Sequence, residues 1–145
     1  FISSTFWTER IGSAAALKTI EIMEKTKSWK VISGKGKYIM KNWIKIAKKN
    51  KLKIKVKGLP ALCSFYFESK NNNAYKTYIT QEMLKYGFLA TNVVYLSTAH
   101  TKLIIDKYLD KIDIIFKKIS EFERGEDIYS CLDSKLATES FSRLN

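Results

Sequence analysis

The residues from Lys51 to Gly58 read KLKIKVKG, and this stretch decides the fold class of the chain. Apolar side chains take every second position and lysines the positions between them: Leu52, Ile54 and Val56 alternate with Lys51, Lys53, Lys55 and Lys57. A period of two is typical of a strand with one face in the core and the other in water. We therefore predict a half-buried strand, whose lysine row is either a solvated face or a protected sheet edge.

Two later segments also have an extended pattern. The GLP stretch at 58–60 predicts a bend that leads into a second strand at 61–67, ALCSFYF, which is rich in aromatic residues. The segment 88–97, FLATNVVYLS, predicts a third extended piece with a turn near Thr91 and Asn92. Together the three segments favour a small sheet.

Two helices are predicted before the first strand. The alanine-rich segment 9–25 forms the first, because alanine and leucine are strong helix formers. Ser28 is a candidate N-cap for the second, which Gly34 and Gly36 are expected to interrupt. The apolar residues that share one face of this second helix are Trp29, Ile32, Ile39, Trp43 and Ile46.

Two more helices are predicted after the second strand. One spans 74–86, follows a break of three asparagines and is closed by Gly87. Thr101 can cap the last helix, which continues until Gly125. Its apolar residues recur every three or four positions: Ile104, Tyr108, Ile112, Ile115, Ile119 and Phe122.

The predicted element order is helix, helix, strand, strand, helix, strand, helix. This order favours an α+β fold in which helices pack on one side of a small sheet. The chain has 145 residues, of which 46% are hydrophobic, and this is enough to build one core. After Gly125 the sequence is polar, and we expect a tail with a short helix.

The formal net charge of +12 raises the question of an anionic partner. Nearly all of the excess is lysine spread from end to end, and Arg10, Arg124 and Arg143 are the only arginines. Base readout and bidentate phosphate binding favour arginine, so we expect no nucleic-acid partner. A free-standing basic module that binds nucleic acid or another polyanion stays open as the alternative function.

Other composition signals concern compartment and metals. Cys63 and Cys131 are far apart and have no CxxC spacing, so neither a zinc site nor a disulfide framework is indicated. The sequence has no apolar run long enough for a membrane span, and it starts without the pattern of a signal peptide. A reduced, cytoplasmic setting is the expectation, with no metal and no membrane partner.

No set of residues in the sequence identifies a self-sufficient catalytic site. His100 lies just before the last helix, where a structural hydrogen bond is expected. The carboxylates near the end of that helix lack a metal-ligand spacing and indicate a solvated helix end: Glu121, Glu123, Glu126 and Asp127. The sequence has no GxSxG, Walker or GxGxxG motif. By themselves the residues support only a soluble α+β domain.

Two motifs carry a resemblance to a known family. STFWTERIGSAAALKTIEIMEK at 4–25 and LSTAHT at 96–101, followed by a long amphipathic helix, resemble the C-terminal part of class III pyridoxal-phosphate (PLP) aminotransferases. The likeness covers essentially the whole chain and is nearest to the branch related to glutamate-1-semialdehyde aminomutase. It implies the small C-terminal domain of a fold-type I PLP-dependent transferase, within an α/β class enzyme, with helices packed on a small, mainly antiparallel sheet.

The resemblance also implies an organisation into three parts. Residues 1–27 would form a helix and phosphate-contact segment that joins a large domain, 28–125 the small domain, and 126–145 a C-terminal tail. The chain would be a piece of a longer polypeptide, because the lysine that forms the Schiff base lies upstream in the family. No lysine here has the matching context, and we expect this segment alone to be inactive.

Site residues follow from the same resemblance. Ser4 and Thr5 would contact the cofactor phosphate of the neighbouring subunit in a homodimer built through the large domain. From the residues alone, Thr5 can also be a helix cap, and Ser4 stands where the family commonly has glycine. Phe6 and Trp7 would pack either at the dimer interface or in the core.

Asn92 is assigned to the substrate pocket by the resemblance, at a position where the aminomutase has an acidic residue. This difference makes strict aminomutase activity a weaker expectation than aminotransferase activity toward a sugar or an amino acid. The implied reaction takes an amino donor and a carbonyl or semialdehyde substrate. A degenerate remnant that dimerises without catalysis is a third reading.

Overall fold

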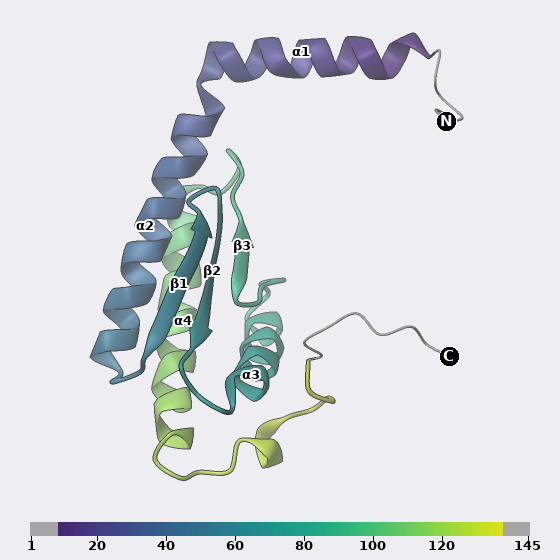
Figure 1. The fold of residues 1–145 in the computed structure, drawn as a ribbon. Coiled ribbons are helices and arrows are strands. Elements are labelled where there is room, and N and C mark those ends of the chain that lie inside the picture. The colour runs from purple at the N-terminus through teal and green to yellow at the C-terminus, as the bar shows by residue number, and fades with distance from the viewer. Residues whose placement is uncertain (1–8, 138–145) are drawn as a thin grey trace.

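The computed structural model describes residues 9–137 and has an α+β fold, as the sequence predicted. In these residues, the helices and strands follow one another in the predicted order (Figure 1). The elements are α1 (Arg10–Thr26), α2 (Ser28–Lys49), β1 (Ile54–Leu59), β2 (Leu62–Phe67), α3 (Asn72–Lys85), β3 (Val93–Tyr95), α4 (Lys102–Phe122) and a 3-10 helix, η1 (Tyr129–Cys131).

The three strands form one antiparallel sheet in the order β1-β2-β3. Val56 of β1 pairs with Phe65 of β2, and Cys63 of β2 pairs with Val94 of β3. The lysines of β1 are exposed while Ile54 and Val56 are partly buried, so the predicted half-buried strand is confirmed. Because β1 lies at an edge of the sheet, its lysines also keep that edge from pairing with another strand.

Two glycines allow the β1–β2 hairpin to form and to pack against α2. Gly58 has a φ of 91°, and a Cβ there would lie 2.4 Å from the Leu62 carbonyl oxygen. A Cβ on Gly36 would lie 1.6 Å from the Pro60 carbonyl oxygen, so only glycine lets α2 approach the hairpin turn. The expected interruption of α2 at Gly34 and Gly36 is wrong, since the helix is continuous there.

Helix ends agree with the predicted caps at two of three positions. The Thr101 side chain accepts a hydrogen bond from the Ile104 amide at 3.3 Å, and Gly87 has the left-handed backbone expected after a helix. Ser28, in contrast, is the first residue of α2, and its predicted role as N-cap is wrong. Lys27 takes that position in a left-handed conformation, because α2 begins directly after α1 ends.

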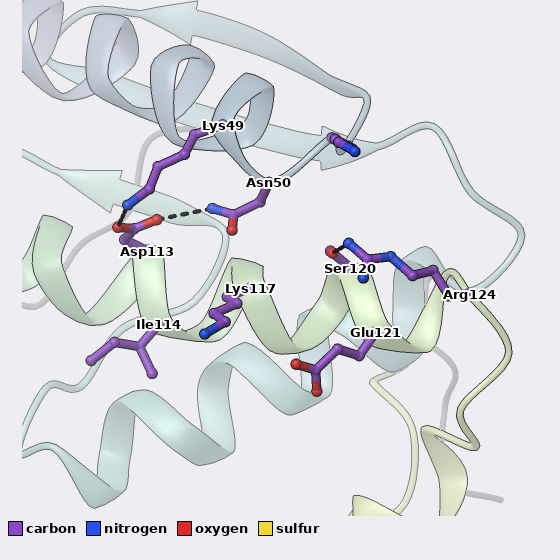
Figure 2. A pocket seen from close by; sticks show the side chains of 9 residues that line it. Lys49, Asn50, Asp113, Ile114, Lys117, Ser120, Glu121 and Arg124 are labelled. Atoms are coloured by element: carbon purple, nitrogen blue, oxygen red, sulfur yellow. Dashed lines mark hydrogen bonds and ion pairs between the residues drawn. The ribbon is translucent and has the colours of Figure 1, made fainter.

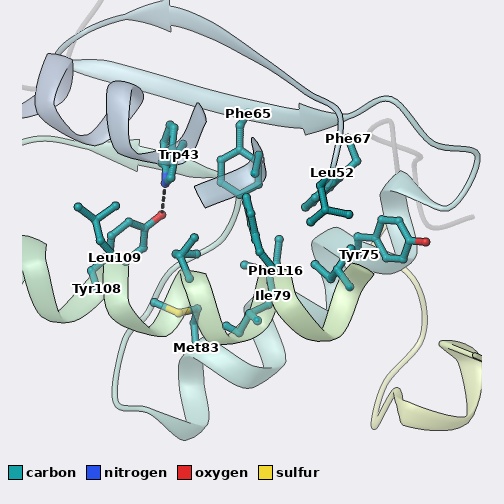
Figure 3. Close-up of a cluster of buried hydrophobic side chains, with 14 of the residues drawn as sticks. Trp43, Leu52, Phe65, Phe67, Tyr75, Ile79, Met83, Tyr108, Leu109 and Phe116 are labelled. Carbon is teal, nitrogen blue, oxygen red and sulfur yellow. Dashed lines mark hydrogen bonds between the residues drawn. The ribbon is translucent and has the colours of Figure 1, made fainter. Parts of the chain in front are cut away.

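The core lies between the sheet and the helices α2, α3 and α4, and it is centred on aromatic side chains (Figure 3). The ring of Phe65 lies 4.8 Å from that of Trp43 and 5.4 Å from that of Phe116, both edge to face. Trp43 Nε1 donates to the hydroxyl of Tyr108 at 3.1 Å, so the buried indole has a partner. These contacts join β2 to both α2 and α4.

The buried face of α4 differs from the prediction at its first turn. Ile104 is 42% exposed, whereas its neighbour Ile105 is 4% exposed and belongs to the core. From Tyr108 onward the predicted apolar residues are all buried. Ile104 and Ile105 are adjacent isoleucines at a helix start, so spacing alone did not decide which one faces the sheet.

The segment after α4 packs against α3. Ile128 is fully buried, and the Gln81 side chain binds the Cys131 carbonyl oxygen at 2.9 Å and the Asp133 amide at 2.7 Å. The amide of Ala137 donates to Thr77 Oγ1 at 2.9 Å. The expected short helix is therefore a 3-10 turn, and residues 126–137 belong to the packed body.

The contact between Gly36 and Pro60 predicts opposite effects for two glycines of α2. Gly36→Ala should destabilise the fold by about 1–3 kcal/mol, because the new Cβ overlaps main-chain atoms of the hairpin turn. Gly34→Ala meets nothing within 4 Å and should stabilise by about 0.5–1 kcal/mol through helix propensity. Urea unfolding measures both. Equal effects of the two substitutions would contradict the packing of α2 on the hairpin.

Candidate functional site

The predicted phosphate-contact residues lie outside the described part of the chain. Ser4 and Thr5, with Phe6 and Trp7, precede residue 9, where the description begins. Their roles stay predictions. The structure does describe helix α1, which follows these residues. It also shows which apolar surfaces of residues 9–137 are not covered by other described residues.

Asn92 is buried between β2 and the start of β3 and is only 5% exposed. Its carboxamide Nδ2 donates to the Phe65 carbonyl oxygen at 2.9 Å, and its own carbonyl oxygen accepts from the Phe65 amide at 3.0 Å. Thr91 Oγ1 donates to Asn92 Oδ1 at 3.3 Å. The side chain thus extends the β2–β3 ladder by one residue. Its predicted contact with substrate stays a prediction.

His100 organises the turn that leads into α4. Its Nδ1 accepts from the Ser97 amide at 2.9 Å, which is the structural hydrogen bond that the sequence predicted. Lys35 from α2 reaches the same turn and donates to the Thr98 carbonyl oxygen at 2.8 Å. The LSTAHT motif therefore fixes the loop between β3 and α4 and provides the cap of α4.

An apolar cavity of about 340 Å³ lies beside this turn. Its lining combines α2, the β3 region and α4 and includes Ile39, Phe88, Leu96, His100, Ile105 and Tyr108. Burial raises the pKa of Tyr108, whose hydroxyl accepts from Trp43. The cavity offers apolar surface with one imidazole at its wall, and no residue in it has the environment of a nucleophile.

The lysines of residues 9–137 do not have the environment of a Schiff-base amine. None of them is buried. Every shifted lysine pKa is raised, because each of these side chains donates a hydrogen bond to a carboxylate: Lys55, Lys85, Lys102 and Lys118. A reactive lysine needs the neutral form, which burial or a nearby cation favours by lowering the pKa. These lysines act instead as partners in surface ion pairs.

The carboxylates at the end of α4 are also engaged with neighbours. Lys118 pairs with Glu121 at 2.9 Å and also with Glu126, and Glu123 accepts from the Tyr75 hydroxyl at 2.7 Å. In the described residues, no group of three histidine, cysteine, aspartate or glutamate side chains could hold a metal ion. Both cysteines are free thiols.

Helix α1 contributes nothing to the core. None of its residues is buried, and it extends away from the body of the molecule (Figure 1). Ile11 and Leu17 are 73% and 71% exposed, and Ile20, Ile22 and Met23 are exposed as well. So many apolar side chains in a helix of 17 residues are typical of a helix that packs against another part of a protein. Residues 9–137 provide no such partner for α1.

The sheet face opposite the core is also uncovered by the described residues. Phe65 and Cys63 point inward, so the alternation of β2 places Leu62 and Tyr66 on the outer face. Tyr95 of β3 pairs with Leu62, and both are exposed. At the β1 side of this face the Lys57 ammonium lies 5.7 Å from the centre of the Tyr66 ring. The outer face is thus apolar at one end and basic at the other.

Within the described residues, no helix combines the length and apolar character that crossing a bilayer requires. This finding leaves the predicted cytoplasmic location a prediction.

No protein-family model and no curated protein matches the chain. Its fold is similar to a solved structure of the FumI protein of Sphingopyxis sp. MTA144 in the PLP internal aldimine form, with a TM-score of 0.74 and 19% sequence identity. The match covers 90% of this chain and 32% of FumI, so the chain spans about a third of the length of that protein. At this identity the likeness shows the fold alone. The fold of the chain is therefore similar to one part of the FumI fold.

Proposed function

We propose that the chain is the C-terminal part of a PLP-dependent enzyme of the class III aminotransferase type, in the branch related to glutamate-1-semialdehyde aminomutase. The observation that carries the proposal is the similarity in fold to FumI, which was solved with PLP. This similarity extends over 90% of this chain and about one third of FumI. The two sequence motifs support the narrower assignment. In this proposal the enzyme transfers an amino group between an amino donor and a carbonyl or semialdehyde substrate.

The bare surfaces of residues 9–137 support a larger body around this fold. Helix α1 has no buried residue, although Ile11 and Leu17 would each contribute about 1.5–3 kcal/mol if fully buried. The outer sheet face exposes Leu62 and Tyr95 in the same way. Both surfaces are accounted for if residues 1–27 join the small domain to a large domain that covers them.

The proposed contribution of this chain to the cofactor is a phosphate contact. The Ser4 amide and the Thr5 hydroxyl would each donate to a phosphate oxygen of PLP held by the partner subunit of a homodimer. Hydrogen bonds to a charged acceptor contribute about 1.5–3 kcal/mol each. When bound, PLP supplies the electron sink for chemistry at the amino-bearing carbon, while the protein positions the reactants.

The amine that holds the cofactor is proposed to lie outside residues 1–145. This placement is supported by the environment of the described lysines, which are unburied and in several cases tied to carboxylates. The chain's own tasks would then be to close one side of the substrate cleft and to reach the neighbouring subunit.

The phosphate contact predicts a specific loss of cofactor. In the protein that contains the large domain, Thr5→Ala should raise the dissociation constant of PLP by about tenfold, because one charge-assisted hydrogen bond is lost. Thr8→Ala removes a hydroxyl three positions later and is the matched control. Equilibrium dialysis measures the dissociation constant of PLP for each variant, under conditions where both variants stay folded. Equal PLP affinity of the Thr5 and Thr8 variants would refute the contact.

Asn92 can be tested for its structural and its functional role together. Asn92→Asp should destabilise the fold by about 3 kcal/mol at pH 7, because a buried carboxylate would face the Phe65 carbonyl oxygen. The pKa of the new carboxyl would be raised, so the deficit relative to the parent chain should shrink as the pH falls and the protonated acid can donate.

Asn42→Asp is the control for this change. Asn42 Nδ2 also donates to a carbonyl oxygen, that of Tyr38 at 2.8 Å, but at a partly exposed position where water can reach a charge. Chemical unfolding at pH 7 and pH 5 compares the two. If Asn92→Asp leaves stability unchanged while altering substrate KM, the side chain serves the substrate pocket and not the β2–β3 ladder.

A further inference from the structure

A groove of about 400 Å³ lies where the end of α2 meets the second half of α4 (Figure 2). One wall is formed by Lys49, the last residue of α2, and by Asn50 and Lys51 directly after it, and α4 and the residues after it provide the other wall. That wall is formed by Asp113, Ile114, Lys117, Ser120, Glu121 and Arg124. The groove is separate from the apolar cavity beside His100, since the two share no lining residue among the described residues.

The two carboxylates of the groove already have cationic partners. Asp113 forms an ion pair with Lys49 through Oδ2 and accepts from Asn50 Nδ2 at 2.9 Å through Oδ1. Burial alone would raise the pKa of Asp113, but these contacts lower it. Glu121 pairs with Lys118 at 2.9 Å, and the hydrogen bond from Lys118 lowers the Glu121 pKa. Both carboxylates are therefore ionised at pH 7, and Glu121 shares the Lys118 ammonium with Glu126.

Three cations of the groove form no close ion pair, although the charges of Lys117 and Arg124 both help to lower the pKa of Glu121. Lys51, Lys117 and Arg124 form no ion pair with any carboxylate of residues 9–137. The Arg124 guanidinium donates from Nη2 to the buried Ser120 hydroxyl at 3.0 Å, which holds it against α4 (Figure 2). The four cationic side chains of the groove thus outnumber its two carboxylates.

The helix dipoles explain why some of these cations lie where they do. Lysines near the end of a helix interact favourably with its last carbonyl groups, and Lys49 and Lys51 have such places at the end of α2. Arg124, two residues after α4, has a similar place. Lys117 lies more than one turn before the end of α4, where the dipole effect has decayed. A dipole role therefore accounts for Lys51 and Arg124 but leaves the place of Lys117 in the same groove unexplained.

We propose that this groove binds a phosphoryl group, either inorganic phosphate or a phosphomonoester. A phosphate carries about −1.5 to −2 charges at pH 7, which matches the groove's surplus of cations. Arg124 supplies the planar fork that suits phosphate oxygens, Ser120 supplies a hydroxyl beside it, and Lys51 and Lys117 supply point charges. The site does not depend on the proposed PLP chemistry.

Titration of the full chain with inorganic phosphate at constant ionic strength tests the site. NMR spectra should show saturable shifts of the Ser120 amide and the Arg124 side-chain Nε–H. The Lys117→Gln and Arg124→Gln substitutions should each weaken phosphate binding by about tenfold, because each removes one charged contact. Thermal unfolding confirms that the variants remain folded at the titration temperature.

Lys41→Gln and Lys107→Gln are the matched controls, because both lysines are exposed on α2 and α4 and neither lines the groove. They remove the same charge and should leave the phosphate affinity within twofold. Equal weakening in control and groove variants would show that phosphate follows the chain's overall charge and would overturn the site. Lower melting temperatures for the groove variants with unchanged phosphate affinity would assign these cations to the stability of the fold and overturn the site as well.

Discussion

The position of Phe65 is the constraint on which the rest of the fold depends. Its ring packs edge to face against Trp43 of α2 and Phe116 of α4, and each such pair contributes about 0.5–1.5 kcal/mol beyond burial. Its amide and carbonyl groups bind Asn92, which ties the third strand to the second. One residue therefore sets the distance between sheet and helices and also the register of β3.

Packing around Phe65 uses only one side of the sheet. Helices α2, α3 and α4 cover the inner face, while Leu62 and Tyr95 stay exposed on the outer face of residues 9–137. Within residues 9–137, nothing buries any residue of α1, and Ile11 and Leu17 are exposed. A well-packed inner core beside two uncovered apolar surfaces supports the proposal that the fold is one part of a larger enzyme. The match to only 32% of FumI supports the same proposal.

Local patterns in the sequence predicted the helices and strands. The features that the patterns missed depend on contacts between residues far apart in the sequence. The lysine alternation of 51–57 predicted β1, and the Thr101 hydroxyl predicted the start of α4, because both signals act within a few residues. Gly36 suggested a break in α2, but its role is to let Pro60 approach, a contact across 24 positions that no local pattern shows. The phosphate-contact assignment of Thr5 came from the resemblance alone, and it lies outside the described residues.

The most direct test of the account is to locate PLP in the protein purified with its cofactor. Borohydride reduction fixes PLP to the lysine that holds it, and peptide mass spectrometry then identifies that lysine. The account predicts one modified lysine in a large domain outside residues 1–145, together with PLP in stoichiometric amount. A modified lysine within residues 1–145, or a folded protein that retains no PLP, would contradict the assignment of this chain to a PLP-dependent enzyme.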